Sequence, residues 1–419
     1  MIDRTEQPPI QKIESVDFIA PEIHKISENV SLFHSKSVKD ETTRFDLYFD
    51  AGKVQGNHGI AGFVNGLLLS GTKDKTSIEI NNEINGLGGF YESGVAVENA
   101  VISIHCLLEN VLPIFDTIMD AIQNVSFIEK EVTEFFSDSK QRMKINAEKV
   151  SYLAQKNFQK SLFHSDAKYA ATLSLNDYDK VQIKDLKNFH SEAYLKGLTK
   201  VVVVGNLEKS IITHISESCS VIASQKFATF SEELKNQSGE KKVEKKGAIQ
   251  SAIRVGRILF NKNHPDYLDF IVLNTILGDY FGSRLMSNIR EDKGYTYGIG
   301  TMMAELQNTG YFLVATEVGH EVKEATLKEI KYEFKRLQTE LVPEAELDLV
   351  KNYMLGQLLK SADGPYAMMD LFLSAEMHGK NLDFYNEAIA RIQTVTSERV
   401  MELAKKYLNW EEMSVVVAG

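Results

Sequence analysis

The sequence predicts an α+β protein built from two homologous α/β-sandwich domains, each a mostly antiparallel sheet covered by helices, joined by a charged linker. A length of 419 residues exceeds one ordinary domain and suits two of about 200 residues. The two halves end in the same pattern, and each mixes strand-like runs with helix-like runs. We therefore divide the chain into a first domain at 1–230, a linker at 231–247 and a second domain at 248–419.

The repeat is clearest where each half ends. An amphipathic helix ending near Tyr194 leads into an apolar strand around Val202, and a similar helix ending near Tyr407 leads into an apolar strand around Val415. A spacing of 213 positions separates the two tyrosines and also the two valines. A repeat of about 200 residues indicates a duplicated domain rather than a solenoid.

The segment 231–247 separates the halves. It is polar, densely charged and poor in aromatic residues, which is the composition of a linker. The domain boundary is therefore expected inside it.

The first half alternates between the two kinds of pattern. Phe45 to Asp50 alternates like a half-buried strand, and Thr76 with Glu79 forms the capping box that begins a helix. In chain order we expect a strand at 45–50, helices at 59–70 and 76–86, a strand or hairpin at 90–107, and helices at 111–122 and 129–160.

The second half repeats this mixture. In chain order we expect a strand near 250–260, a helix at 264–288, strands near 295–304 and 310–317, and mostly helix thereafter. Strands mixed with helices in this way favour a largely antiparallel sheet covered by helices.

Composition excludes several classes of function. The net charge is −11 and no Lys/Arg-rich stretch alternates with aromatic residues, so no nucleic-acid partner is expected. Cys106 and Cys219 are the only cysteines, too few for a disulfide framework. No apolar run reaches 18 residues and no secretory signal is visible, so we expect no membrane partner and a cytoplasmic location, or a periplasmic one if a signal peptide has been removed.

One segment carries a recognisable motif. Residues 59–72 read Gly-Ile-Ala-Gly-Phe-Val-Asn-Gly-Leu-Leu-Leu-Ser-Gly-Thr. This segment resembles the zinc-binding helix of the pitrilysin/insulinase metallopeptidases, which reads roughly G-x-A-H-F-x-E-H-x-x-x-x-G-T. Here Gly62 and Gly66 stand at the two His positions, and Asn65 stands at the position of the catalytic Glu.

The chemistry of that motif depends on the missing residues. Two His at i and i+4 hold the metal, and the Glu takes a proton from the water that zinc has made acidic. Glycine has no donor atom and an Asn amide is not a general base. The resemblance places the family's remaining ligand, a Glu, at Arg142, 76 positions after Gly66. A permanent cation would repel zinc, so we expect no metal in this chain.

The alternative is an ordinary apolar helix with two small residues for close packing. Two mid-helix glycines argue weakly against it, because each costs about 1 kcal/mol relative to Ala. No two of the ten histidines stand at the i, i+3 or i, i+4 spacing of a helical metal pair, and only His58 lies next to the motif. The full set is His24, His34, His58, His105, His164, His190, His214, His264, His320 and His378.

A second segment, 284–298, reads Arg-Leu-Met-Ser-Asn-Ile-Arg-Glu-Asp-Lys-Gly-Tyr-Thr-Tyr-Gly. It resembles the family's second-half signature R-L-x-x-x-[LI]-R-x-x-x-G-x-x-Y. The resemblance implies that Arg290 and Tyr297 bind substrate, holding its carbonyl oxygen and the developing oxyanion. The alternative is that Arg290 complements a helix dipole and Tyr297 packs in a strand.

The resemblance covers nearly the whole chain and is strongest to the two-subunit bacterial peptidases of the family. It implies a non-catalytic subunit of a heterodimeric zinc metallopeptidase, inactive alone. Zinc is then expected in a partner of similar size that carries H-x-x-E-H, with a peptide as substrate added to a sheet edge.

Two other hypotheses remain open. One is an inactive structural or peptide-binding homologue, like the family's core subunits in respiratory complexes, with no role in proteolysis. The other is an independent enzyme, for which no nucleophile elbow, P-loop or dinucleotide fingerprint is visible. Stoichiometric zinc in the purified chain would contradict our interpretation of the 59–72 helix.

Overall fold

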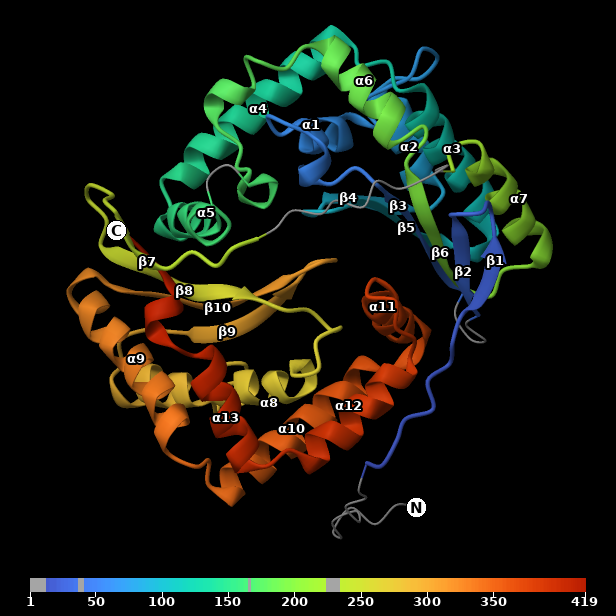
Figure 1. The fold of residues 1–419 in the computed structure, drawn as a ribbon. Helices are drawn as coiled ribbons and strands as arrows, with labels where there is room; N and C mark the ends of the chain where they lie inside the picture. Colours follow the sequence, from blue (N-terminus) through green and yellow to red (C-terminus); the bar gives the residue numbers. More distant parts are fainter. Residues whose placement is uncertain (1–12, 37–40, 165–166, 224–233) are drawn as a thin grey trace, which may run out of the picture.

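The computed structural model describes residues 13–36, 41–164, 167–223 and 234–419. It contains two sheets of mostly antiparallel strands, covered by helices, as predicted (Figure 1). The first half of the chain forms one sheet and the second half forms the other.

The first sheet has six strands in the order β1-β2-β6-β3-β5-β4, and only the β2–β6 pair is parallel. Its strands are β1 (Glu22–Lys25), β2 (Ser31–Ser35), β3 (Thr42–Phe49), β4 (Phe90–Val95), β5 (Ala100–Leu107) and β6 (Leu198–Val204). The helices of this half are α1 (Ile60–Leu67), α2 (Ser77–Gly86), α3 (Val111–Asn124), α4 (Glu129–Ala147), α5 (Val150–Leu162), α6 (Ile183–Ala193) and α7 (Lys209–Ser220).

The second sheet has five strands in the order β7-β11-β8-β10-β9, and only the β7–β11 pair is parallel. Its strands are β7 (Gly239–Val243), β8 (Gln250–Leu259), β9 (Ile299–Glu305), β10 (Gly310–Gly319) and β11 (Ser414–Ala418). The helices are α8 (Tyr267–Leu277), a π-helix η5 (Met286–Asp292), α9 (Lys323–Thr339), α10 (Glu344–Ser361), α11 (Gly364–Glu376), α12 (Asp383–Thr394) and α13 (Ser397–Tyr407).

The predicted linker at 231–247 is wrong for residues 239–243, which form strand β7. This strand runs parallel to the last strand of its sheet, β11, just as β2 runs parallel to β6 in the first half. Four of its five residues are exposed. An edge strand needs a backbone partner on one side only, so a polar sequence can form it. Residues 231–233 lie outside the described residues.

The bounds of three further expected elements need correction. The single helix expected at 129–160 is two helices, because Lys149 takes an extended conformation between α4 and α5. The helix expected at 264–288 ends at Leu277, where Gly278 leaves helical geometry. The strand expected from 295 begins at Ile299. The capping box is confirmed: Thr76 Oγ1 accepts from the Glu79 amide, and Glu79 Oε2 accepts from the Thr76 amide.

Each sheet receives one helix from the opposite half. Helix α5 of the first half packs on β8 and β11, where Phe158 joins Leu313 and Val416 in one buried cluster. Helix α11 of the second half packs on β6, and the Phe372 ring lies 5.0 Å from that of Phe33. Each sheet is thus covered on one face by its own helices and on the other by a helix of its partner half (Figure 1).

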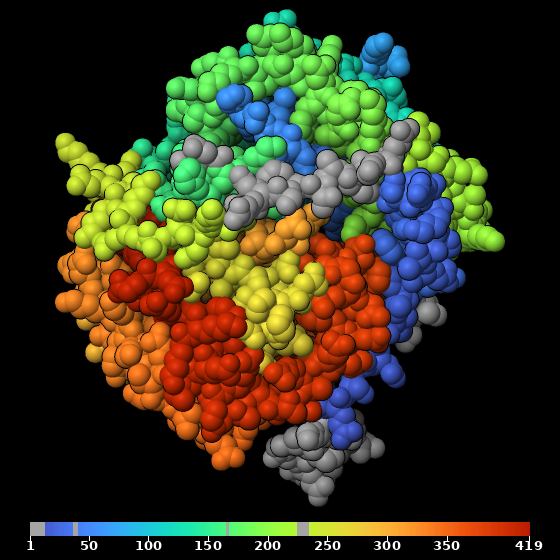
Figure 2. All heavy atoms as spheres, in the orientation of Figure 1, coloured from blue at the N-terminus to red at the C-terminus, as the bar shows by residue number. Residues whose placement is uncertain are grey.

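The exchange makes the two halves one continuous body. In Figure 2 the orange-red atoms of the second half lie directly against the blue atoms near the N-terminus. Arg44 of β3 donates to Asp370 of α11 at 2.7 Å across this boundary. In the described part of the chain no single helix is long and apolar enough to cross a bilayer, and only the bent pair 108–124 and 129–147 meets the length and composition criteria together.

Candidate functional site

Helix α1 carries the segment that resembles a zinc-binding helix, and it lies beneath α4 in Figure 1. It begins after Gly59, whose φ of +76° is a left-handed conformation that favours glycine. Phe63 and its neighbours on the same face are buried in the core, whereas Gly62 and Gly66 are exposed. The predicted i, i+4 pair therefore shares one outward face of the helix, as the motif requires.

Asn65 is turned the other way. Its side chain is buried, and its Nδ2 donates to the phenol oxygen of Tyr194 at 3.2 Å. Burial raises the pKa of Tyr194, so its phenol stays neutral at physiological pH. At the position of the family's catalytic carboxylate this chain has a neutral hydrogen bond between α1 and the end of α6.

The two glycines open onto different cavities. Gly62 lines a cavity of about 700 Å³ together with Arg142. Gly66 instead lines a second cavity of about 270 Å³ whose walls include Asp138. The ring of Phe135, from α4, lies against Gly66: a Cβ added at Gly66 would lie 2.6 Å from two ring carbons, whereas one added at Gly62 meets nothing within 4 Å. The structure thus brings Gly62 and Arg142 together but keeps Gly66 apart.

The cavity at Gly62 is cationic, although the chain as a whole is acidic. Asp177 is the carboxylate among its described lining residues, and it is already paired with His58 at 2.8 Å and with Lys180 at 3.3 Å. Burial would raise the pKa of Asp177, but hydrogen bonds from Ser174 and His58 outweigh it and hold that pKa below its usual range. The cations that line the cavity are Lys53, Arg142, Lys156 and Lys160.

These residues do not fit a zinc ion. Zinc takes His, Cys, Asp or Glu ligands in a tetrahedral set, and positions 62, 65, 66 and 142 offer two glycines, a buried amide and a cation. His58 does reach the cavity, but its Nδ1 is engaged with Asp177. Positions 62, 65, 66 and 142 therefore do not supply the ligands for metal-assisted peptide hydrolysis.

Arg290 and Tyr297 lie on the surface of the second half. Arg290 is in the π-helix η5, with its guanidinium carbon 4.6 Å from the centre of the exposed Phe281 ring and its Nε 3.3 Å from Glu291. Tyr297 precedes β9 and is 94% exposed, so it does not pack as a strand residue would. Neither lines the cavity at Gly62.

Sequence reasoning missed several residues of this region. The obstruction by Phe135 and the cations Lys53, Lys156 and Lys160 come from three separate segments, and no local pattern connects them. It also missed a group of possible metal ligands, Glu22, His24 and His34, on the β1–β2 hairpin. The i, i+2 spacing of Glu22 and His24, which places both on one face of a strand, is the sequence signal for this group.

Comparison with known proteins agrees with this architecture. Residues 33–175 match the sequence profile of insulinase (peptidase family M16), and residues 180–354 match that of the peptidase M16 inactive domain. The chain belongs to peptidase family M16. Its second half matches the sequence profile of the peptidase M16 inactive domain, which is consistent with a non-catalytic homologue.

Similar sequences span most of the chain. An uncharacterized zinc protease of Rickettsia bellii is 23% identical over 356 residues, covering 83% of this chain and 82% of that protein. An uncharacterized zinc protease of Bacillus subtilis is 21% identical and covers 83% and 85%. The mitochondrial-processing peptidase subunit beta of Caenorhabditis elegans is 21% identical and covers 99% and 94%.

Solved structures share the fold. A peptidase M16 inactive domain protein from Pseudomonas fluorescens superposes with a TM-score of 0.87 at 23% identity, covering 96% of this chain and 98% of that one. A protease from Helicobacter pylori gives a TM-score of 0.85 at 17% identity, with 96% and 100% covered. At these identities the likeness shows the fold alone.

Proposed function

We propose that this chain is the non-catalytic subunit of a two-subunit zinc peptidase. It binds an extended peptide and presents Arg290 and Tyr297 to a zinc centre that belongs to a second M16 chain. The observation that carries the proposal is a contrast within the molecule. The motif helix offers no zinc ligand, whereas the Arg/Tyr pair is present and open to another molecule.

The surface around Arg290 has the composition of a binding site. Phe281 is 64% exposed and Tyr297 is 94% exposed. Aromatic side chains and arginine are the residues that most often dominate interface energies. Stacking on Phe281 orients the guanidinium while leaving its side chain one-third exposed. This patch is therefore suited to contact a partner or a substrate.

Two of the four edge strands could take up the peptide. Among the described residues, strand β4 pairs only with β5 and packs beside α1, and strand β9 pairs only with β10 and follows Tyr297. An extended peptide that adds to such an edge gains main-chain hydrogen bonds without demanding a particular sequence. A peptide added to the β9 edge would lie close to Tyr297, which precedes that strand by two positions.

The chemistry expected of this chain is electrostatic. During peptide hydrolysis negative charge grows on the carbonyl oxygen, and donors already aimed at that oxygen lower the barrier. Arg290 would supply a fixed positive charge with several N–H groups, and Tyr297 would supply one directed O–H. The metal that activates the nucleophile would come from the other chain.

The test is reconstitution with an M16 chain from the same cell that carries H-x-x-E-H. We expect peptidase activity from the mixture and much less from either chain alone. Arg290→Ala and Tyr297→Phe should each lower kcat by roughly 100-fold, the cost of losing one oxyanion donor. Tyr332→Phe, which changes a 53% exposed tyrosine on α9, serves as the matched control and should leave activity unchanged.

Two outcomes would decide against the proposal. Full activity in both the Arg290 and Tyr297 variants would remove their proposed role. A stable complex that shows no gain in proteolysis would instead support the structural or peptide-binding homologue.

A further inference from the structure

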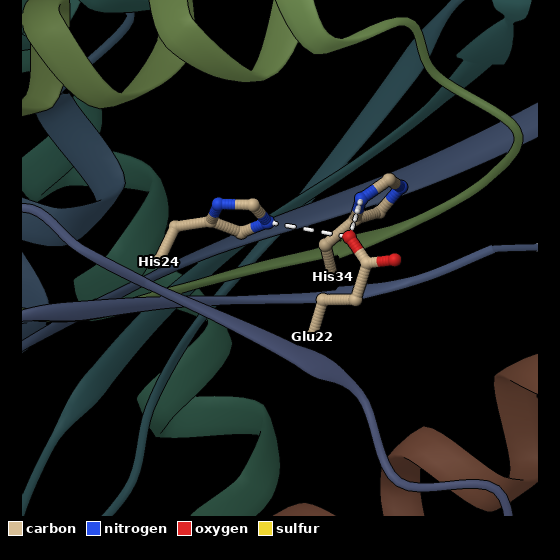
Figure 3. Close-up of side chains that lie close together, drawn as sticks. All are labelled: Glu22, His24 and His34. Atoms are coloured by element: carbon tan, nitrogen blue, oxygen red, sulfur yellow. Dashed lines mark ion pairs between the residues drawn. The ribbon is translucent and has the colours of Figure 1, made fainter.

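The hairpin of β1 and β2 gathers three metal-ligating side chains, far along the chain from the motif helix. Glu22 and His24 are two positions apart on β1 and so project from the same face of the sheet. His34 is the direct cross-strand partner of Glu22 and shares that face. Figure 3 shows all three side chains converging from the two strands.

The donor atoms lie close together. His24 Nε2 is 3.6 Å and His34 Nδ1 is 4.0 Å from the same oxygen, Oε2 of Glu22, and all three atoms fall within 4.8 Å of one another. A tetrahedral metal with bonds of about 2.0–2.2 Å holds its ligands roughly 3.3–3.5 Å apart. Small side-chain rotations would therefore complete the geometry.

The hydrogen bonds around the group leave acceptors facing one another. His34 Nε2 lies 2.9 Å from the Gly205 carbonyl, which can only accept, so Nε2 carries the proton and Nδ1 points its lone pair at Glu22. His24 Nε2 is buried and has no hydrogen-bond partner. Two ring nitrogens and one carboxylate oxygen thus converge, and the Nδ1 lone pair of His34 is directed at this point.

The surroundings resemble the outer shell of a metal site. The carbonyl of Gly205 fixes the tautomer and ring orientation of His34, as partners of metal-bound imidazoles commonly do. Lys36 donates to Oε1 of Glu22 at 2.9 Å, so its charge competes with a metal cation for this carboxylate, while Oε2 faces the two histidines. His34 is 1% exposed, so one ligand is rigidly placed by the core.

We infer that Glu22, His24 and His34 form a site for a zinc-class divalent cation. Two imidazoles and one carboxylate suit zinc and its neighbours rather than magnesium or calcium, which prefer oxygen ligands alone. The side chains of Glu22 and His24 are 53% and 36% exposed, so water can take the fourth position. The bound ion ties the edge strand β1 to β2.

This inference is independent of the proposed function, and it changes how metal analysis must be interpreted. Stoichiometric zinc in the intact chain would not by itself show that the α1 helix binds metal. A His24→Ala variant separates the two places, because its zinc content reports only on what remains elsewhere. His58→Ala, beside α1, is the matched control.

The experiment titrates the full chain, stripped with a chelator, with Zn²⁺ against a chromophoric competitor and with Co²⁺ as a spectroscopic probe. We expect one ion per chain and the visible absorption of tetrahedral Co²⁺. Loss of an outer-shell partner alone costs about 10–100-fold in affinity, so His24→Ala and Glu22→Gln should each weaken binding by roughly 100-fold or more. His58→Ala should bind as the unaltered chain does.

A variant that is expected to bind zinc more tightly serves as a control, because a misfolded protein would bind zinc more weakly. Lys36→Met removes a cation that competes for Glu22, so it should tighten zinc binding and increase the rise in Tm that zinc produces. The inference fails if no saturable binding is found, if binding survives His24→Ala, or if Lys36→Met weakens it.

Discussion

The ring of Phe135 occupies the space that a side chain at Gly66 would need, with two ring carbons 2.6 Å from the position of an added Cβ. The same helix face at Gly62, one turn earlier, is open. The two glycines at the positions that resemble the family's histidines therefore have different surroundings. Gly66 is required by the packing of α4, whereas Gly62 is not.

This difference predicts opposite responses to alanine. Gly62→Ala should raise the free energy of unfolding by about 0.5–1 kcal/mol, because alanine restricts the unfolded chain and favours the helix. Gly66→Ala should lower it by about 1 kcal/mol, because Phe135 must shift to make room. Urea denaturation of both variants measures the two changes.

A double variant provides the control. With Phe135→Ala in the background, Gly66→Ala should become stabilising like Gly62→Ala, since the obstructing ring is gone. If Gly66→Ala is equally harmful in both backgrounds, the ring is not the reason for glycine at this position.

Those helices and strands whose apolar side chains recur at a regular spacing were predictable from the sequence. The apolar face of α1 and the paired helix–strand ends near Tyr194 and Tyr407 carry strong local periodicity, and both appear in the structure. Strand β7 was not predictable in this way. Its lysines and glutamate are exposed, and the strand exists because its backbone pairs with β11, about 175 residues later.

The sequence alone predicts that positions 62, 65 and 66 offer no zinc ligand, but it does not predict what surrounds them. Residue types alone exclude zinc at Gly62, Asn65 and Gly66. The approach of Phe135 to Gly66 and the pairing of His34 with Glu22 depend on how separate segments meet. One sequence without its tertiary contacts does not contain that information in any local spacing.

A second prediction concerns Glu98, which joins the two halves. Its carboxylate accepts the Gln307 amide at 2.9 and 3.0 Å and the Tyr169 hydroxyl at 2.7 Å. Glu98→Ala removes the charged acceptor of the Gln307 amide and of this Tyr169 hydroxyl bond, and it should lower the free energy of unfolding by about 1.5–3 kcal/mol. Glu98→Gln keeps one acceptor oxygen and should lose roughly half as much.

The measurement for Glu98 is chemical denaturation followed by far-UV circular dichroism. Glu92→Ala on the exposed face of β4 is the control and should change stability by less than about 0.5 kcal/mol. Equal losses in the Glu92 and Glu98 variants would show that the contact between halves contributes nothing specific.

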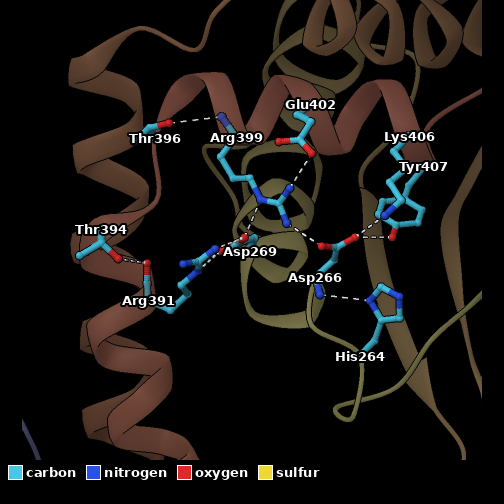
Figure 4. A network of polar contacts seen from close by, with 10 residues as sticks. All are labelled: His264, Asp266, Asp269, Arg391, Thr394, Thr396, Arg399, Glu402, Lys406 and Tyr407. Carbon is cyan, nitrogen blue, oxygen red and sulfur yellow. Dashed lines mark hydrogen bonds and ion pairs between the residues drawn. The ribbon is translucent and has the colours of Figure 1, made fainter.

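The third prediction concerns acid stability and the ion pairs at the start of α8. Asp269 accepts from Arg391 and from Arg399, and Asp266 accepts from Arg399, Lys406 and Tyr407 (Figure 4). Burial would raise the pKa of Asp269, but hydrogen bonds from the two arginines outweigh it and hold the pKa below its usual value. The folded chain therefore binds fewer protons here than the unfolded chain does.

That difference in bound protons decides how the free energy of unfolding changes with pH. An unfolded Asp titrates near pH 3.9, so the stabilisation is complete above about pH 5 and is lost as pH falls through the lower folded pKa. Asp269→Asn should cost about 3 kcal/mol at pH 7, because two arginines lose their carboxylate. The same variant should lose less stability than the unaltered chain between about pH 5 and pH 2.

Glu402→Gln tests whether the large stability loss expected for Asp269→Asn depends on the burial of Asp269. Glu402 also accepts from Arg399, at 2.8 Å, but its side chain is 64% exposed, so its removal should cost no more than about 0.5 kcal/mol. Unfolding free energies measured across the pH range for both variants decide the matter. An Asp269→Asn profile parallel to that of the unaltered chain would mean that the acid sensitivity arises from other carboxylates.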